Sequence, residues 1–200
     1  MNYGSIRTHF KALLNRSDIT DALADTFIDQ GITRIQRTLR IPSMETQNTY
    51  NFSAQTTKVT LPANFLEAID VYYSNRALTR LPMSDMQDHL KNGETGDPYY
   101  FAREGSSLLL SPQPSSGSLV LNYYASFTEM ATDSDESLLA QIAPDLIIYG
   151  ALTYASDYYL DERSEVFGNK YMTFMSEIQE QANDQELTGS IQSIRPSYRL

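Results

Sequence analysis

The densest group of side chains that could bind a metal is the acidic run Asp133-Ser134-Asp135-Glu136. Clustered carboxylates are the ligands that hard cations such as calcium prefer. A calcium loop beginning at Asp133 would also need glycine at its sixth position and a bidentate glutamate at its twelfth, and these positions hold Leu138 and Pro144. We therefore interpret the run as a solvated loop and helix cap, and we predict no metal site.

Carboxylates also support hydrolysis of a glycosidic bond, which needs two of them at a suitable separation. The chain has 25 Asp and Glu residues, so some pair meets that distance by chance. Other catalytic residues are scarce, because there is no Cys and the two His, His9 and His89, lack a partner at ligand or triad spacing. No phosphate-binding glycine loop or serine-hydrolase motif occurs. We predict no catalytic residue and no cofactor.

Four tyrosine doublets are candidates for binding rather than catalysis: Tyr72-Tyr73, Tyr99-Tyr100, Tyr123-Tyr124 and Tyr158-Tyr159. Neighbouring residues of a strand face opposite sides of its sheet, so three of the doublets are expected to send one ring into the core and one outward. Outward tyrosines suit a protein interface, and they also suit base stacking in single-stranded nucleic acid. The surrounding region, residues 44–127, has five basic and eight acidic residues, which favours the protein interface. Scattered surface tyrosines remain an alternative.

Charge is distributed unevenly along the chain. The 15 Lys and Arg against 25 Asp and Glu give a net charge of −10, which works against binding nucleic acid through its phosphates. Residues 128–187 hold thirteen acidic and two basic residues and so carry most of the excess. No apolar run approaches the roughly 18 residues that span a bilayer, and the first residues lack a signal-peptide stretch. We expect the protein to act where it is made, without a membrane.

The elements that position these residues begin with two helices. Apolar residues at helical spacing predict a short helix over 5–14, and Ser17-Asp18 is the expected cap of a longer one that ends before Pro42. Gly31 lies inside the longer helix, where glycine is unfavourable unless a neighbouring helix approaches closely.

From about residue 44 to 127 the apolar period changes to two, which predicts strands. Examples are the alternating positions of Val59 and Leu61, of Ile69, Val71 and Tyr73, and of Leu119, Leu121 and Tyr123. Turn residues such as Asn75-Arg76 separate the alternating stretches. We expect a meander of five to seven short strands, interrupted by one helix over 84–91 with Ser84-Asp85 as its cap.

Helical spacing returns after the acidic run. Pro144 suits the first position of a buried helix, and a last helix is expected over about 162–186. The fold class is therefore α+β: a discontinuous bundle of N-terminal helices (1–43) and C-terminal helices (128–187), an inserted antiparallel β module (44–127) and an extended C-terminal arm (188–200). The predicted core of the bundle is Leu23, Ile28, Ile35, Leu146, Phe167, Tyr171, Phe174 and Ile178.

The last thirteen residues, 188–200, have the composition of a docking segment. Apolar residues alternate with Arg195, Ser197 and Arg199 from residue 194 onward, and so short a segment cannot bury its own apolar edge. We expect it to run extended against a partner or a neighbouring subunit. Its candidate partner-binding residues are Ile191, Ile194, Arg195, Pro196, Tyr198, Arg199 and Leu200.

Several segments, in their order and spacing, resemble the head-to-tail adaptor (connector) proteins of tailed bacteriophages, particularly the podovirus type. The resemblance covers about residues 15–185, and no single segment is diagnostic. The matching stretches are Val59-Thr60-Leu61-Pro62-Ala63-Asn64-Phe65-Leu66, Gly96-Asp97-Pro98-Tyr99-Tyr100-Phe101, Leu108-Leu109-Leu110-Ser111-Pro112-Gln113-Pro114, Leu119-Val120-Leu121-Asn122-Tyr123-Tyr124, Pro144-Asp145-Leu146-Ile147 and Gly150-Ala151-Leu152-Thr153-Tyr154-Ala155.

The resemblance implies a structural virion protein that is made in the host cytoplasm and located at the head-tail junction. Such a protein forms a homo-oligomeric ring, commonly a dodecamer, between the portal protein and a tail protein of the nozzle or tail-tube kind. Genomic DNA passes through the ring without specific binding, and a C-terminal arm reaches the portal or a neighbouring subunit. If the acidic residues of 128–187 line the channel, they make it electronegative; otherwise they form a solvated face. A tail-associated peptidoglycan hydrolase and a single-stranded nucleic-acid-binding module are the alternatives.

Overall fold

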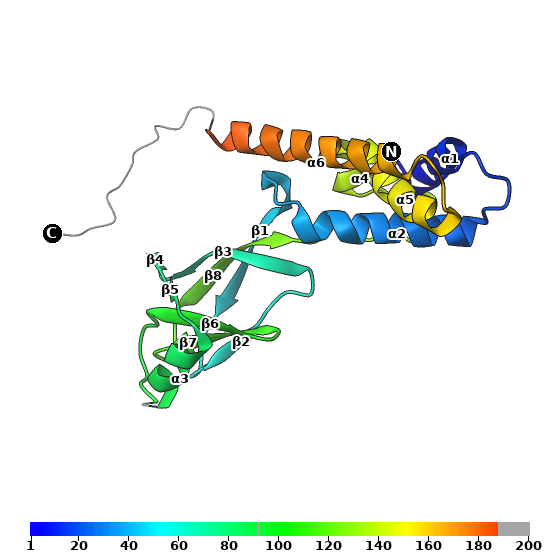
Figure 1. The fold of residues 1–200 in the computed structure, drawn as a ribbon. Helices are drawn as coiled ribbons and strands as arrows, with labels where there is room; N and C mark the ends of the chain where they lie inside the picture. Colours follow the sequence, from blue (N-terminus) through cyan, green and yellow to red (C-terminus); the bar gives the residue numbers. More distant parts are fainter. Residues whose placement is uncertain (92, 188–200) are drawn as a thin grey trace. The chain divides into compact units, whose positions relative to one another are not determined.

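A computed structural model describes residues 1–91 and 93–187 of the 200-residue chain. It shows the expected α+β class, with helices at both ends of the described chain and strands between them (Figure 1). The chain divides into two compact units. The helical unit comprises Met1–Ser43 and the chain from Phe127 onward, and the β unit comprises Met44–Ser126. No helix among the described residues is long and apolar enough to cross a membrane.

The helical unit packs around one central helix, α5. Among its described residues the α-helices are α1 (Tyr3–Leu14), α2 (Asp21–Thr38), α4 (Leu138–Ile142), α5 (Pro144–Tyr159) and α6 (Ser164–Leu187). Helices α1, α2, α4 and α6 all pack against α5. Because α5 is covered on several sides, it buries apolar residues around most of its circumference, among them Leu146, Ile147, Ala151, Leu152 and Ala155.

The expected cap of the second helix is wrong. The helix begins at Asp21, and the hydroxyl oxygen of Thr20 accepts a hydrogen bond from the backbone N–H of Leu23 at 3.2 Å. Asp18 instead binds Arg16 at 2.9 Å. The cap expected for the short middle helix is also displaced, because α3 (Met83–Lys91) already includes Ser84 and Asp85 in its first turn. The last helix begins at Ser164, two residues later than expected.

Gly31 marks a close approach of α2 and α5, as its position in the sequence predicted. A Cβ atom at Gly31 would lie 2.8 Å from the backbone nitrogen of Ala151 and 3.1 Å from the carbonyl carbon of Gly150. No side chain fits at such distances, and the atoms it would meet belong to a helix backbone, which cannot swing aside. The two backbones are therefore in contact through two glycines.

The β unit consists of two four-stranded sheets rather than one meander. The first has the order β1 (Glu45–Asn51), β8 (Ser118–Ala125), β3 (Phe65–Tyr73), β4 (Arg76–Ala77), and the second has the order β2 (Lys58–Thr60), β7 (Ser107–Ser111), β6 (Tyr100–Glu104), β5 (Thr79–Arg80). All pairings are antiparallel except β5 with β6, which is parallel. Alternation identifies a strand but not its partner, and two-residue strands such as β4 and β5 leave almost no pattern.

Strand β3 shows why the expected alternation is only partly correct. Val71 and Tyr73 are buried, but Ile69 is 38% exposed although it has the same parity in the sequence. The pairing of β3 with β8 shifts between Ala68 and Asp70, and such a bulge reverses which residues face the core. The turn after β3 is also displaced by one residue, because Ser74 and Asn75 hold the positive φ angles and Arg76 already belongs to β4.

The predicted core of the bundle is correct in part. Ile28, Ile35, Leu146, Phe167 and Tyr171 are buried, whereas Leu23, Phe174 and Ile178 are only half-buried. The small residue next to Leu23, Ala24, takes the fully buried position instead. Ile178 lines an open hollow of about 270 Å³ together with Ile41 and Ile142. Phe174 packs edge-on against Tyr149, with 5.4 Å between the ring centroids.

Candidate interaction surfaces

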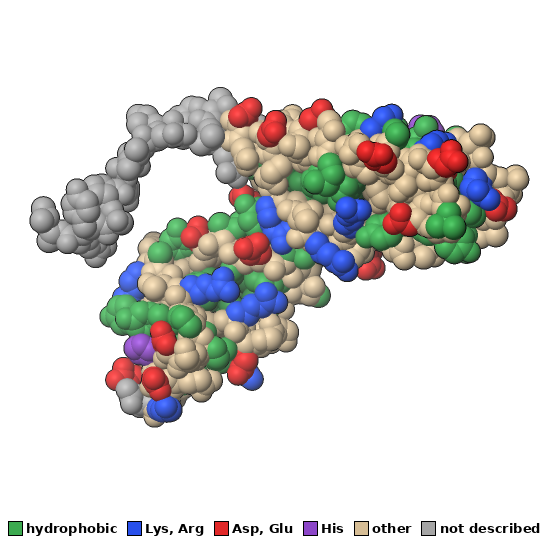
Figure 2. Space-filling model, in the orientation of Figure 1, with side chains coloured by type: hydrophobic (Ala, Val, Ile, Leu, Met, Phe, Trp, Pro, Cys, Tyr) green, Lys and Arg blue, Asp and Glu red, His purple; other side chains and the backbone are tan. Residues whose placement is uncertain are grey.

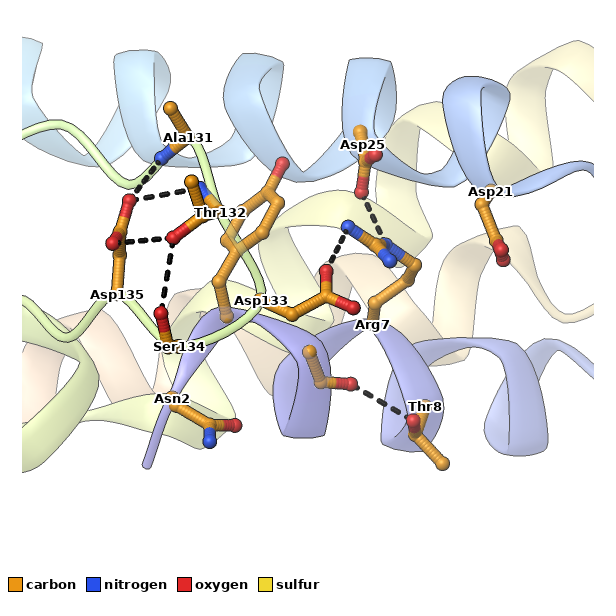
Figure 3. A network of polar contacts seen from close by, with 12 residues as sticks. Asn2, Arg7, Thr8, Asp21, Asp25, Ala131, Thr132, Asp133, Ser134 and Asp135 are labelled. Carbon is orange, nitrogen blue, oxygen red and sulfur yellow. Dashed lines mark hydrogen bonds and ion pairs between the residues drawn. The ribbon is translucent and has the colours of Figure 1, made fainter.

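The acidic loop is occupied by structural contacts (Figure 3). The Asp135 carboxylate accepts hydrogen bonds from the backbone N–H groups of Ala131 and Thr132 at 2.8 Å and from the Thr132 hydroxyl at 2.6 Å. These bonds hold the pKa of Asp135 below its usual value. The Asp133 and Asp135 carbonyls accept the N–H groups of Gly4 at 3.0 Å and Tyr3 at 2.9 Å. The loop therefore caps the first turn of α1.

Arg7 connects this loop to two helices (Figure 3). Its Nε atom lies 2.5 Å from Asp25 of α2, and its terminal nitrogen lies 2.8 Å from Asp133 of the loop. The Arg7 side chain is only 15% exposed. Nearby, the Tyr3 hydroxyl donates to Asp29 at 3.2 Å, and burial raises the pKa of both groups. Among residues 1–91 and 93–187, no group of three or more His, Cys, Asp or Glu side chains is placed to hold a metal.

A second arginine, Arg163, connects the start of α6 to the end of α1. Its terminal nitrogens donate to the carbonyls of Leu13 at 3.2 Å and Leu14 at 2.9 Å, and it also binds Asp161 at 2.6 Å. These carbonyls are among those that the last turn of a helix leaves without a partner. Sequence reasoning missed this role. The available signal was that Arg163 is one of only two basic residues within 128–187.

Arg163→Met is expected to raise the pKa of Asp161. The Arg163 guanidinium and backbone N–H hold this pKa at about 2, and without the cation it moves toward the ordinary value of about 3.9. Because the folded pKa is depressed, the pair stabilises the protein above the unfolded pKa, and this contribution is lost as the pH falls from about 4 to 2. An NMR titration of the Asp161 carboxyl measures the shift. Arg163→Lys, which keeps the charge, serves as the control, and an unchanged pKa in Arg163→Met contradicts the assignment.

The two histidines lie at the surface, whereas the tyrosine doublets are divided between surface and core. His9 and His89 are both exposed, and the His89 ring lies 4.8 Å from the Tyr100 ring. Two doublets of the β unit divide as expected, with Tyr73 and Tyr123 buried and their neighbours Tyr72 and Tyr124 half-buried. The third does not send a ring fully into the core, because Tyr100 is half-buried and Tyr99 is 52% exposed. The Arg76 guanidinium lies over the Tyr99 ring at 4.0 Å. Their role in binding stays a prediction.

Acidic side chains lie on the exposed side of α6, as the charge distribution predicted (Figure 2). Glu165, Glu177 and Glu180 are all exposed. The segment that follows α2 is attached to the same helix through Gln179, whose amide nitrogen donates to the Arg40 carbonyl at 2.8 Å. The predicted partner-binding residues of the arm, from Ile191 to Leu200, lie outside the described residues.

The fold is thus that of an α+β protein in which Arg7 ties the acidic loop to α1 and α2, and Arg163 ties the start of α6 to the end of α1. The chain belongs to the SU10 adaptor protein family, whose family model matches residues 1–195. This match confirms the resemblance to a phage head-tail adaptor, while the podovirus type stays a prediction. A search of curated proteins found no relative that matches the chain.

Proposed function

We propose that the protein is a non-enzymatic structural component of the virion that forms a ring between the portal protein and the tail. The observation that carries the proposal is the family match, which extends over residues 1–195. The contacts of the acidic loop support it, because Asp133 and Asp135 serve Arg7 and the loop backbone rather than an open cleft. The ring is a homo-oligomer, dodecameric in the form that the resemblance implies, and its lower surface binds a nozzle or tail-tube protein.

Genomic DNA passes through the ring without specific binding. Binding through phosphates requires a local excess of Lys and Arg, and this chain carries a net charge of −10. A basic channel wall would hold the phosphates and slow their passage. Neither a hydrolase nor a single-stranded nucleic-acid-binding module is favoured by the family match.

The segment 188–200 is the proposed arm that attaches each subunit to the portal or to its neighbour. Its apolar anchors are Ile194, Tyr198 and Leu200, and Arg195 and Arg199 pair with acidic groups of the partner. Ile191 and Pro196 complete the apolar edge.

Deleting residues 188–200 is expected to abolish incorporation into portal-bound rings while leaving the thermal stability of the monomer nearly unchanged. The described residues of the helical unit already form a packed core, with Phe10, Ile28 and Leu152 fully buried, and we expect this core to persist without the last thirteen residues. Electron microscopy of portal rings mixed with the truncated protein measures incorporation, and calorimetry measures stability.

A full-length variant with Ile194, Tyr198 and Leu200 changed to Ala tests the anchors themselves. Its matched control changes Ser190, Ser193 and Ser197 to Ala, which leaves the apolar edge intact. Normal incorporation of the truncated protein would show that the arm is not the attachment.

A further inference from the structure

Two adjoining hollows of the β unit share a pair of arginines. One hollow, of about 390 Å³, is lined by Leu81, Pro82 and Met83 with Arg80 and Arg103. The other, of about 200 Å³, has the same two arginines at its rim. Its remaining lining residues are Phe65, Leu66, Glu67, Ala68, Phe101 and Leu108. One glutamate against two arginines leaves the lining with a net positive charge.

The two arginines project from one face of the second sheet. Arg80 lies on the edge strand β5 and pairs with Phe101 in the parallel register of β5 and β6. Arg103 is two residues beyond Phe101 on β6, and residues two apart on a strand face the same side. Phe101 and Leu108 are buried, so apolar side chains form the floor between two cations.

Neither arginine forms an ion pair with a described residue. The Arg80 side chain also makes no hydrogen bond with any described residue. Arg103 donates from Nε to the Gly105 carbonyl at 3.0 Å and lies 5.1 Å from the Phe65 ring, and it too has no ion pair within the described chain. These contacts orient the Arg103 guanidinium while leaving its terminal nitrogens available. A surface arrangement of this kind fits two carboxylates.

The same chain carries two exposed carboxylates on one face of a helix. Glu177 and Glu180 are exposed on α6, one helical turn apart, and residues so spaced have Cβ atoms about 5 to 6 Å apart. Neither makes an ion pair with a described residue, although Glu180 accepts a hydrogen bond from the Ser176 hydroxyl at 3.0 Å. No basic residue occurs in α6 after Lys170. The pair of arginines and the pair of glutamates are therefore complementary in charge.

We infer that the Arg80–Arg103 hollow of one copy binds the Glu177–Glu180 face of α6 from a second copy. The inference rests on the proposed ring, for which it supplies a lateral contact. The two surfaces differ, so the contact is heterologous, and repeating it from copy to copy closes a ring or extends a filament.

A charge exchange tests this contact. The double substitution Arg80→Glu and Arg103→Glu is expected to reduce incorporation into portal-bound rings at least about tenfold, because like charges then face each other. Adding Glu177→Arg and Glu180→Arg to the same chain is expected to restore incorporation, since the contact is re-formed with reversed signs. Arg37→Glu with Lys91→Glu makes the same change in net charge at other exposed positions and is expected to leave incorporation within about twofold of the wild type.

Arg80→Glu alone is the variant to use if the double substitution alters the fold, because the Arg80 side chain has no polar contact to lose. Calorimetry of each monomer separates misfolding from loss of the contact.

Normal incorporation of the variants that carry Glu at position 80, or at both 80 and 103, overturns the contact. If the Arg80→Glu and Arg103→Glu variant loses incorporation and the added Glu177→Arg and Glu180→Arg do not restore it, α6 is not the occupant of the hollow. The hollow then binds an acidic surface of the portal or a phosphate. If the wild-type protein itself forms no ring on the portal, it is the proposed function that fails.

Discussion

Gly31→Leu is expected to disrupt the packing of the helical unit. The Cβ atom alone would lie 2.8 Å from the backbone of Ala151, so α2 and α5 have to separate to admit any side chain. Both helices contribute fully buried residues, such as Ile28 and Leu152, whose contacts are lost when the helices move apart. We expect the free energy of unfolding to fall by about 3 kcal/mol or more, at the upper end of the usual cost of overpacking.

The matched comparison uses the same small substitution at two helical glycines. Gly31→Ala is expected to destabilise by about 1 to 2 kcal/mol because the backbone clash exceeds the gain in helix propensity. Gly168→Ala, in α6, is expected to stabilise by about 0.5 to 1 kcal/mol, since nothing lies within 4 Å of the added Cβ atom. Chemical denaturation followed by circular dichroism measures both. If both substitutions change the free energy of unfolding by the same amount and in the same direction, the close approach of α2 and α5 at Gly31 is contradicted.

Arg7→Met is expected to lower the free energy of unfolding by about 2 kcal/mol. The methionine keeps the apolar stem of the side chain but removes the cation that binds Asp25 and Asp133. Asp25 is only 30% exposed, so its carboxylate loses a partner in a place where water replaces it poorly. The loop that caps α1 loses its ion pair at the same time.

Lys11→Met on the same helix is the control. Lys11 binds Asp21 at 2.8 Å, but Asp21 is 65% exposed, and exposed ion pairs contribute at most about 1 kcal/mol. We expect Arg7→Met to cost clearly more than Lys11→Met in thermal and chemical denaturation. Similar losses would show that Arg7 acts as an ordinary surface cation.

Local patterns in the sequence identified the helices but not all of their boundaries. The spacing of apolar residues predicted α1, α5 and α6, and Pro144 and Gly31 had the roles expected from their backbone properties. Thr20 replaced Ser17-Asp18 as a cap because several residues near a helix start offer a side-chain oxygen, and only the path of the chain decides which one reaches the helix.

Features that depend on residues far apart in the chain could not be predicted from the sequence. The strand order follows from partners far apart in the chain, as in the pairing of β1 with β8. The bulge near Ile69 leaves no local signal, so the parity of β3 was predicted wrongly there. Arg7 and Arg163 bind groups more than 100 residues away in the sequence, and no spacing rule indicates such a pair. The sequence also gives no sign that Arg80 and Arg103 lie near each other, because only the parallel pairing of β5 and β6 brings them together.

The most direct test of the proposed function is the mass of the assembly, measured by native mass spectrometry with and without a portal ring and checked by electron microscopy. Alone, the chain is expected to be a monomer or a weak oligomer, because premature rings would compete with ordered assembly. With the portal, it is expected to form one ring bound to the portal, with a mass that corresponds to a whole number of copies. A tight dimer that forms without the portal and remains the sole state in its presence would contradict the proposal.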